Sequence, residues 1–256
     1  MRRTGLWEDM QGLVGVGDND QTNWGLHHSV LDKLGMLIAS NDLNAGQVLK
    51  IEELEVRFGV SRSVIRETIR VLESMGLVSS RRRVGVTVAA RAEWNLFDPR
   101  IIRWRLAGQE RDRQLRSLGE LRHGIEPVAA ALAAQHATPE QCGVLTGAVM
   151  QMAVHGRSGD LEAYLAADVL FHRTLLEASG NEMLASLIGV VTEVLTGRTH
   201  HHLMPAHPEP AAIRWHAEVA QAVQSGDAAE AERSMRDIVD EATRAMLGGA
   251  PGETRS

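Results

Sequence analysis

A carboxylate and an imidazole lie one helical turn apart in the segment ADVLFH, residues 167–172. Asp168 and His172 have the i, i+4 spacing that puts two side chains on one face of a helix. Leu165 and Leu175 share that face, so the face is expected to point into a helical core. A buried charge is costly unless it is paired, metal-bound or hydrated. The two residues therefore indicate a polar site inside a bundle.

Two more polar residues fall on apolar helical stripes in the same half of the chain. His216 is in line with Val219 and Val223, and Arg122 lies beside Leu118, so a second imidazole and a guanidinium are expected near the same interior. Three explanations are open: a structural hydrogen-bond network, a divalent metal with positions left for a ligand, and a metal-dependent hydrolase. Because no general base has independent support, we favour a sensor and expect neither enzymatic activity nor catalytic residues.

A second set of residues that could do chemistry is basic. Arg62, Arg66 and Arg70 recur at every fourth position of a helix predicted from Ser61 to Met75, opposite an apolar stripe. Like charges at this spacing destabilise an isolated helix by about 0.2–0.5 kcal/mol per pair, so an anion is expected against that face. The alternative is a basic face that is simply solvated.

The elements around the basic helix follow the order helix, turn, helix, hairpin. Helical spacing predicts helices over Leu26–Ser40 and Ile51–Phe58, and LVSSRRRVGVTVAA after the basic helix reads as two strands around a basic turn. This is the order of a winged helix-turn-helix, whose third helix enters the DNA major groove. The expected DNA contacts are Ser61, Arg62, Ser63, Arg66, Arg70, Arg81, Arg82, Arg83 and Gly85.

The rest of the chain predicts a second domain. Helical periodicity continues almost throughout residues 112–247 without a convincing strand. It predicts a bundle of six to seven helices, with helices near 112–136, 138–154, 159–178, 181–197, 210–224 and 227–247. The fold class is therefore mainly α, with a winged helix-turn-helix followed by an all-α bundle. The expected boundaries are a mobile arm 1–25, a DNA-binding domain 26–90, a linker 91–108, a ligand-binding and dimerisation domain 109–248 and a tail 249–256.

Charge and composition agree with two domains that have different partners. The formal net charge of −6 divides into −2, +4 and −8 over residues 1–25, 26–106 and 107–256, so the basic part coincides with the predicted DNA-binding domain. No apolar run approaches the roughly 18–20 residues of a membrane span, and the N-terminus does not resemble a signal peptide. We expect a cytoplasmic protein without a membrane partner.

The segment VSRSVIRETIRVLESMGLV resembles the recognition helix of the GntR family of bacterial transcription regulators. The resemblance covers residues 26–88. In members of the FadR subfamily, an arginine that contacts DNA often lies early in the second helix, and the aligned position here is Glu52. Because Glu52 replaces this arginine, we expect the DNA contacts to come mainly from Arg62, Arg66 and the wing residues 81–83.

Residues 112–247 look like the FCD ligand-binding domain of the FadR subfamily. The likeness rests on the motifs RHGIEPVAA, DVLFHRTLLEASGN and HAEVAQAVQSGDAAEA. It implies that Asp168, His172 and His216 bind a divalent metal such as zinc, and that Ile238 occupies the position of a further family histidine. A carboxylate effector is expected to pair with Arg122. Asn181 most simply caps a helix, but it matches a family residue that often borders the ligand pocket, so it is also a candidate effector contact.

The connector EWNLFDPRIIRW, residues 93–104, is similar to a segment of FadR-subfamily regulators that respond to sugar acids such as galactonate or gluconate. Its other interpretation is an amphipathic linker with packed tryptophans. The resemblance as a whole implies a homodimeric repressor that binds a palindromic operator in double-stranded DNA under control of a small carboxylate effector. A regulator of the same fold that senses a fatty-acyl or amino-acid-derived ligand stays an alternative, as does the metal-dependent hydrolase.

Overall fold

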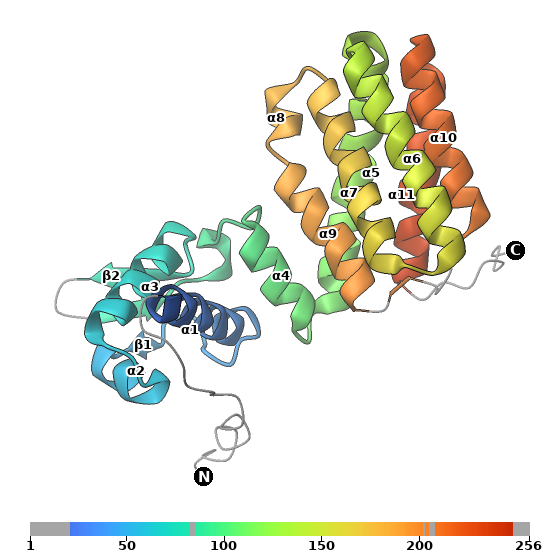
Figure 1. The fold of residues 1–256 in the computed structure, drawn as a ribbon. Coiled ribbons are helices and arrows are strands. Elements are labelled where there is room, and N and C mark those ends of the chain that lie inside the picture. The colour runs from blue at the N-terminus through green and yellow to red at the C-terminus, as the bar shows by residue number, and fades with distance from the viewer. Residues whose placement is uncertain (1–20, 82–84, 202, 205–207, 248–256) are drawn as a thin grey trace, which may run out of the picture. The chain divides into compact units, whose positions relative to one another are not determined.

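The computed structural model of the chain describes residues 21–81, 85–201, 203–204 and 208–247. The chain divides into two compact units, one made mainly of residues up to Trp94 and the other mainly of residues from Asn95 onward. Figure 1 shows helices in both units and a small sheet in the N-terminal one. The mainly α fold class predicted from the sequence is confirmed.

The N-terminal unit contains three helices, α1 (Gln21–Ala39), α2 (Ile51–Phe58) and α3 (Arg62–Ser74). Helix α2 ends at Gly59, which has a φ of +64° and donates its backbone N–H to the carbonyl of Glu55. The predicted arm 1–25 is corrected at its end, because α1 already begins at Gln21. Apolar periodicity marks only the part of a helix that has an apolar stripe, and this first turn has none.

A three-stranded antiparallel sheet completes this unit. Its strands are β1 (Val48–Leu49), β2 (Val78–Arg81) and β3 (Gly85–Val88), in the order β1-β3-β2. The hairpin of β2 and β3 is the one predicted, with Arg81 opposite Gly85, whose φ of +99° favours glycine. Strand β1 was not predicted, because two residues are too short to show an alternating pattern.

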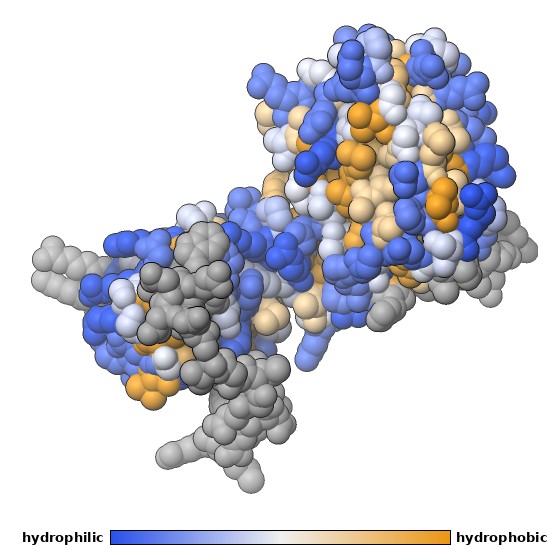
Figure 2. All heavy atoms as spheres, viewed as in Figure 1, coloured by the Kyte–Doolittle hydropathy of each residue, from blue (hydrophilic) through white to orange (hydrophobic). Residues whose placement is uncertain are grey.

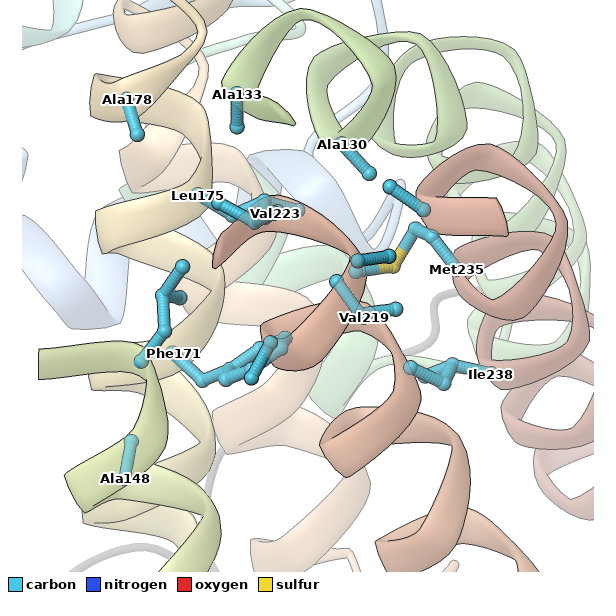
Figure 3. Packing of buried hydrophobic residues seen from close by; sticks show 14 of the residues in the cluster. Ala130, Ala133, Ala148, Phe171, Leu175, Ala178, Val219, Val223, Met235 and Ile238 are labelled. Carbon is cyan, nitrogen blue, oxygen red and sulfur yellow. The ribbon is translucent and has the colours of Figure 1, made fainter. Parts of the chain in front are cut away.

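The C-terminal unit is a helical bundle. Its helices are α5 (Arg111–His136), α6 (Pro139–Ser158), α7 (Leu161–Ala178), α8 (Glu182–Ala185), α9 (Ile188–His200), α10 (Pro210–Ser225) and α11 (Ala228–Met246). Helix α11 packs along α5 and α10, and α7 packs along α6 and α9. Figure 3 shows the apolar core between these helices, in which Phe171, Val219 and Ile238 are buried.

The region predicted as one helix over residues 181–197 is corrected to two helices. Asn181 caps the single turn of α8, and α9 begins only at Ile188 and runs to His200, beyond the predicted end. The predicted linker 91–108 contains a helix of its own, α4 (Pro99–Ala107), which Asp98 caps. Ile102 and Leu106 of α4 are buried against Val194 of α9, so α4 belongs to the core of the bundle unit.

Two predicted segments lie mostly or wholly outside the described residues: the N-terminal arm, apart from residues 21–25, and the tail 249–256. Within the described residues, no helix is both long enough and apolar enough to cross a membrane.

Candidate functional site

Helix α7 carries the first two residues of the candidate site. It begins after Asp160, whose side chain accepts a hydrogen bond from the backbone N–H of Ala163. Its apolar stripe faces the core, and Asp168 and His172 lie among the buried residues of the helix, each 1% exposed. Helix α10 brings His216, which is 3% exposed. The sequence prediction that these three side chains point into the bundle is confirmed by their burial.

The three side chains converge on one point. Oδ1 of Asp168 lies 3.4 Å from Nε2 of His172 and 3.3 Å from Nε2 of His216. The candidate ligand atoms of the triad all lie within 4.8 Å of one another. Ligand atoms roughly 2.0–2.1 Å from one tetrahedral zinc ion are about 3.3–3.4 Å apart. The observed separations therefore match those around a shared metal ion and are longer than those of charge-assisted hydrogen bonds.

The outer nitrogen of each imidazole lies close to an oxygen atom. Nδ1 of His216 lies 2.7 Å from the backbone carbonyl oxygen of Ala212. A carbonyl oxygen only accepts, so Nδ1 carries a proton, and in the neutral form of the ring the lone pair is on Nε2, which lies beside Asp168. Nδ1 of His172 lies 2.7 Å from Oε2 of Glu126, in ion-pair contact but outside hydrogen-bond geometry. Outer partners of this kind orient metal-binding histidines, so the residues present fit a divalent metal.

Two arginines are paired with the carboxylates of the site. Nη2 of Arg198, on α9, donates to Oδ2 of Asp168 at 3.0 Å. Arg122, on α5, donates through Nε and Nη2 to the two oxygens of Glu126, at 2.5 and 3.2 Å. We call these six residues the polar cluster: Arg122, Glu126, Asp168, His172, Arg198 and His216. All six side chains are buried.

Ionisation in the polar cluster is set by competition between burial and pairing. Burial by itself would raise the pKa of Asp168, but His172, His216 and Arg198 outweigh it and hold that pKa well below its ordinary value. Burial likewise opposes ionisation of Glu126, yet Arg122 and His172 lower its pKa to about 2. Both carboxylates therefore stay charged at neutral pH.

The sequence-predicted residues are only partly brought together. Arg122 joins the triad in the polar cluster, whereas Asn181 is exposed and its side chain accepts hydrogen bonds from the backbone of Met183 and Leu184. Asn181 therefore caps α8 and is no member of the buried cluster. Ile238, at the position of the further family histidine, is buried in the apolar core (Figure 3).

Two members of the polar cluster were missed from the sequence. Glu126 lies four residues after Arg122 on the same face of α5, so the periodicity that found Arg122 could have found it. Arg198 falls on the buried face of α9 with Val191 and Val194, but it lies one residue beyond the predicted helix.

The predicted DNA-contacting residues that the structure describes lie at α3 and at the hairpin. Ser61, Arg62, Ser63, Arg66 and Arg70 are exposed at the start and along one face of α3, as are Arg81 of β2 and Gly85 of β3. Ile65, Ile69 and Leu72 of α3 face the core. Arg62 forms an ion pair with Glu52 of α2 at 2.9 Å, and Arg70 pairs with Glu67. Arg82 and Arg83, predicted in the wing, lie outside the described residues.

Comparison with known proteins gives matches to both units. The FCD domain family matches residues 117–241, and the gntR family of bacterial regulatory proteins matches residues 26–88. The HTH-type transcriptional regulator LutR of Bacillus subtilis is 30% identical over 205 residues, which cover 78% of this chain and 91% of LutR. The chain belongs to the GntR family. This GntR-family protein is a DNA-binding transcriptional regulator and not an enzyme, which removes the hydrolase alternative.

Other GntR-family relatives extend the comparison. The galactonate operon transcriptional repressor of Escherichia coli is 27% identical over 215 residues, covering 83% of this chain and 93% of that repressor. Among solved structures, Lar, described as controlling the agr system of Listeria monocytogenes, has 19% identity and a TM-score of 0.56, and the match covers 91% of this chain and 99% of Lar. That likeness supports the fold.

Proposed function

We propose that this regulator is a homodimeric repressor whose binding to a palindromic operator is controlled by a sugar acid held in the polar cluster. The observation that carries the proposal is the convergence of Asp168, His172 and His216 inside the ligand-binding unit. Three ionisable groups that converge inside a core are hard to explain by stability alone, because apolar side chains in the same volume would often stabilise the fold as much or more.

The triad is proposed to hold a divalent metal such as zinc. Such an ion would supply a Lewis-acidic centre that attracts effector oxygens. The protein residues do the rest: Glu126 and the carbonyl of Ala212 fix the two imidazoles, and Arg198 holds Oδ2 of Asp168 so that Oδ1 faces the imidazoles. Outer contacts of this kind keep ligand side chains in place before the metal arrives.

Two observations support a sugar acid as the effector: the buried positive charge of Arg122 and the similarity of the chain to sugar-acid regulators. Arg122 is 1% exposed, and its Nη1 has no hydrogen-bond partner among the described residues, so a carboxylate would find a guanidinium donor there. The connector 93–104 resembles that of sugar-acid regulators, and the E. coli relative is named for the galactonate operon. Operator control requires that the effector favour one of two states of the dimer over the other.

The dimer proposal is supported by the exposed apolar side chains of the bundle. Figure 2 shows hydrophobic residues along the visible face of the bundle. Exposed apolar side chains of α6 include Met150 and Val154, which are one turn apart on the same side of the helix. Apolar side chains that gather on one face favour an interface, and a two-fold symmetric dimer matches a palindromic operator.

The test combines ligand and DNA binding. Thermal unfolding is measured with galactonate, gluconate, a fatty acyl compound and amino acids, each with and without zinc. A sugar acid is expected to raise the unfolding temperature most, because a ligand at 100 times its Kd stabilises the fold by about 2.7 kcal/mol. The same acid should change the retardation of DNA from upstream of the regulator's coding region. Stabilisation by a fatty acyl compound or an amino acid alone would contradict the assignment.

A further inference from the structure

Two buried guanidinium groups in the polar cluster have donors that the protein leaves unused. Nη1 of Arg122 and Nε of Arg198 have no hydrogen-bond partner among the described residues. The two residues are 1% and 8% exposed. A buried donor without an acceptor is destabilising, and such donors are rare in native structures. Each arginine is thus equipped to donate to a bound group.

The polar cluster has as many guanidinium groups as carboxylates. Its two carboxylates, Glu126 and Asp168, are each paired with one guanidinium. No other described carboxylate is in ion-pair contact with these six side chains. A divalent cation on the triad would therefore leave two positive charges uncompensated in a buried place. Buried charge of this size calls for an anionic partner.

We infer that the effector is a dianion, a sugar acid with a carboxylate at each end, and that Arg198 binds one of these carboxylates while Arg122 binds the other. This inference rests on the proposed function and deepens it. Two carboxylates would supply acceptors for both unused donors and would balance the charge of the metal. Both arginines adjoin the triad: Arg198 contacts Asp168 at 3.0 Å, and Arg122 pairs with Glu126, which lies 2.7 Å from His172.

The competing explanation is that Arg198 only neutralises Asp168. In that case a monocarboxylate would satisfy the site as well as a dicarboxylate. The unused Nε speaks against it, because a purely structural arginine in a dry site is expected to have its donors satisfied. The two explanations differ in what they predict for ligands that share a carbon skeleton.

Galactonate and galactarate are such a pair, since they differ only in whether the sixth carbon is a hydroxymethyl or a carboxylate group. Gluconate and glucarate form a second pair. Calorimetric titration of the full-length, zinc-loaded protein would compare the members of each pair. We expect the diacid of at least one pair to bind at least about tenfold more tightly than its monoacid, a typical effect of one buried charged hydrogen bond.

The variants Arg198→Gln and Arg198→Lys separate recognition from structure. Arg198→Gln is expected to reduce the ratio of diacid to monoacid affinity to about one, because the diacid loses one contact more than the monoacid does. Arg198→Lys keeps the charge beside Asp168 and should retain part of the preference. The matched control is Arg116→Gln, which removes an exposed arginine of α5. Thermal unfolding without ligand would verify that each variant is folded.

Three results would overturn the inference. Equal affinity for monoacid and diacid in the wild type would show that the protein does not recognise a second carboxylate of the effector. The sugar-acid proposal would remain. An Arg198→Gln variant that weakens both acids by the same factor would assign Arg198 a structural role only. If neither acid of either pair binds, the sugar-acid proposal fails, and the inference fails with it.

Discussion

Arg198 of α9 and Asp168 of α7 form a buried ion pair at 3.0 Å, although 30 residues separate them in the chain. The pair joins α9 to the triad of Asp168, His172 and His216. The residue before Arg198 is Gly197, which faces Leu106 of α4. Helix α9 therefore contacts the polar cluster at one residue and α4 at the next. Because α4 follows the DNA-binding unit in the chain, we propose that α9 and α4 take part in the effector response.

The Gly197 contact predicts a stability effect. A Cβ atom at position 197 would lie 2.7 Å from Cδ1 of buried Leu106, so Gly197→Ala should lower the free energy of unfolding by about 1–3 kcal/mol through overpacking. Gly124→Ala is the matched control, because a Cβ there meets nothing within 4 Å and alanine favours helix. Chemical denaturation would compare the two variants. A Gly197→Ala variant as stable as Gly124→Ala would show that α4 and α9 are not closely packed.

His172 is predicted to serve effector response and not DNA binding. His172→Ala removes one triad ligand from the bundle unit, so operator affinity without effector should stay within about threefold of wild type while the effector response is lost. The control is His155→Ala, because this histidine of α6 lies outside the polar cluster and contacts Gln151. Fluorescence anisotropy with a labelled operator measures both quantities. A normal response of His172→Ala to every active effector would mean that the effector binds elsewhere.

Arg66 is predicted to contact DNA. It is exposed on α3, on the side opposite buried Ile65 and Ile69. Arg66→Ala should cost about 1–3 kcal/mol of operator binding if the side chain reads a base, while sedimentation shows an unchanged oligomeric state. Arg113→Ala, on the exposed side of α5, provides a charge-matched control. Equal operator affinity of the two variants would exclude a DNA contact by Arg66.

Glu52 is predicted to restrict what Arg62 can bind. Its carboxylate holds the guanidinium of Arg62 at 2.9 Å and adds negative charge beside the DNA-binding face. Glu52→Gln should raise the affinity for nonspecific DNA several-fold and steepen its salt dependence, because Arg62 becomes available to phosphates. The ratio of operator to nonspecific affinity should fall. Retardation assays at several salt concentrations check this, and an unchanged ratio would show that Glu52 has no part in specificity.

Much of the fold could be predicted because each element carries its own local pattern. The basic face and apolar stripe of α3 identified its helix. Gly59 and Gly76, both at positive φ, stand just after α2 and α3, where glycine is typical of a helix end. Strand β1 could not be found, because its two residues owe their conformation to pairing with β3. The break between α8 and α9 was missed for a related reason: Asn181 caps a single turn, which periodicity cannot resolve.

The candidate site was predictable where polar residues interrupt an apolar stripe. Asp168, His172 and His216 each stand where a bundle would place an apolar side chain, and this conflict marks functional positions. Arg198 was not predicted as a site residue because its helix was expected to end at residue 197, whereas α9 continues to His200. The pairing of Arg198 with Asp168 depends on how α9 packs against α7, which no local pattern contains.

The most direct test of the account is the metal content of the bundle. The purified protein is stripped with a chelator, reloaded with zinc, dialysed and analysed by inductively coupled plasma mass spectrometry, beside His216→Ala and the control His155→Ala. The account predicts about one zinc ion per chain in the wild type and in His155→Ala, and much less in His216→Ala. No retained zinc in the wild type, or the same content in all three proteins, would contradict it.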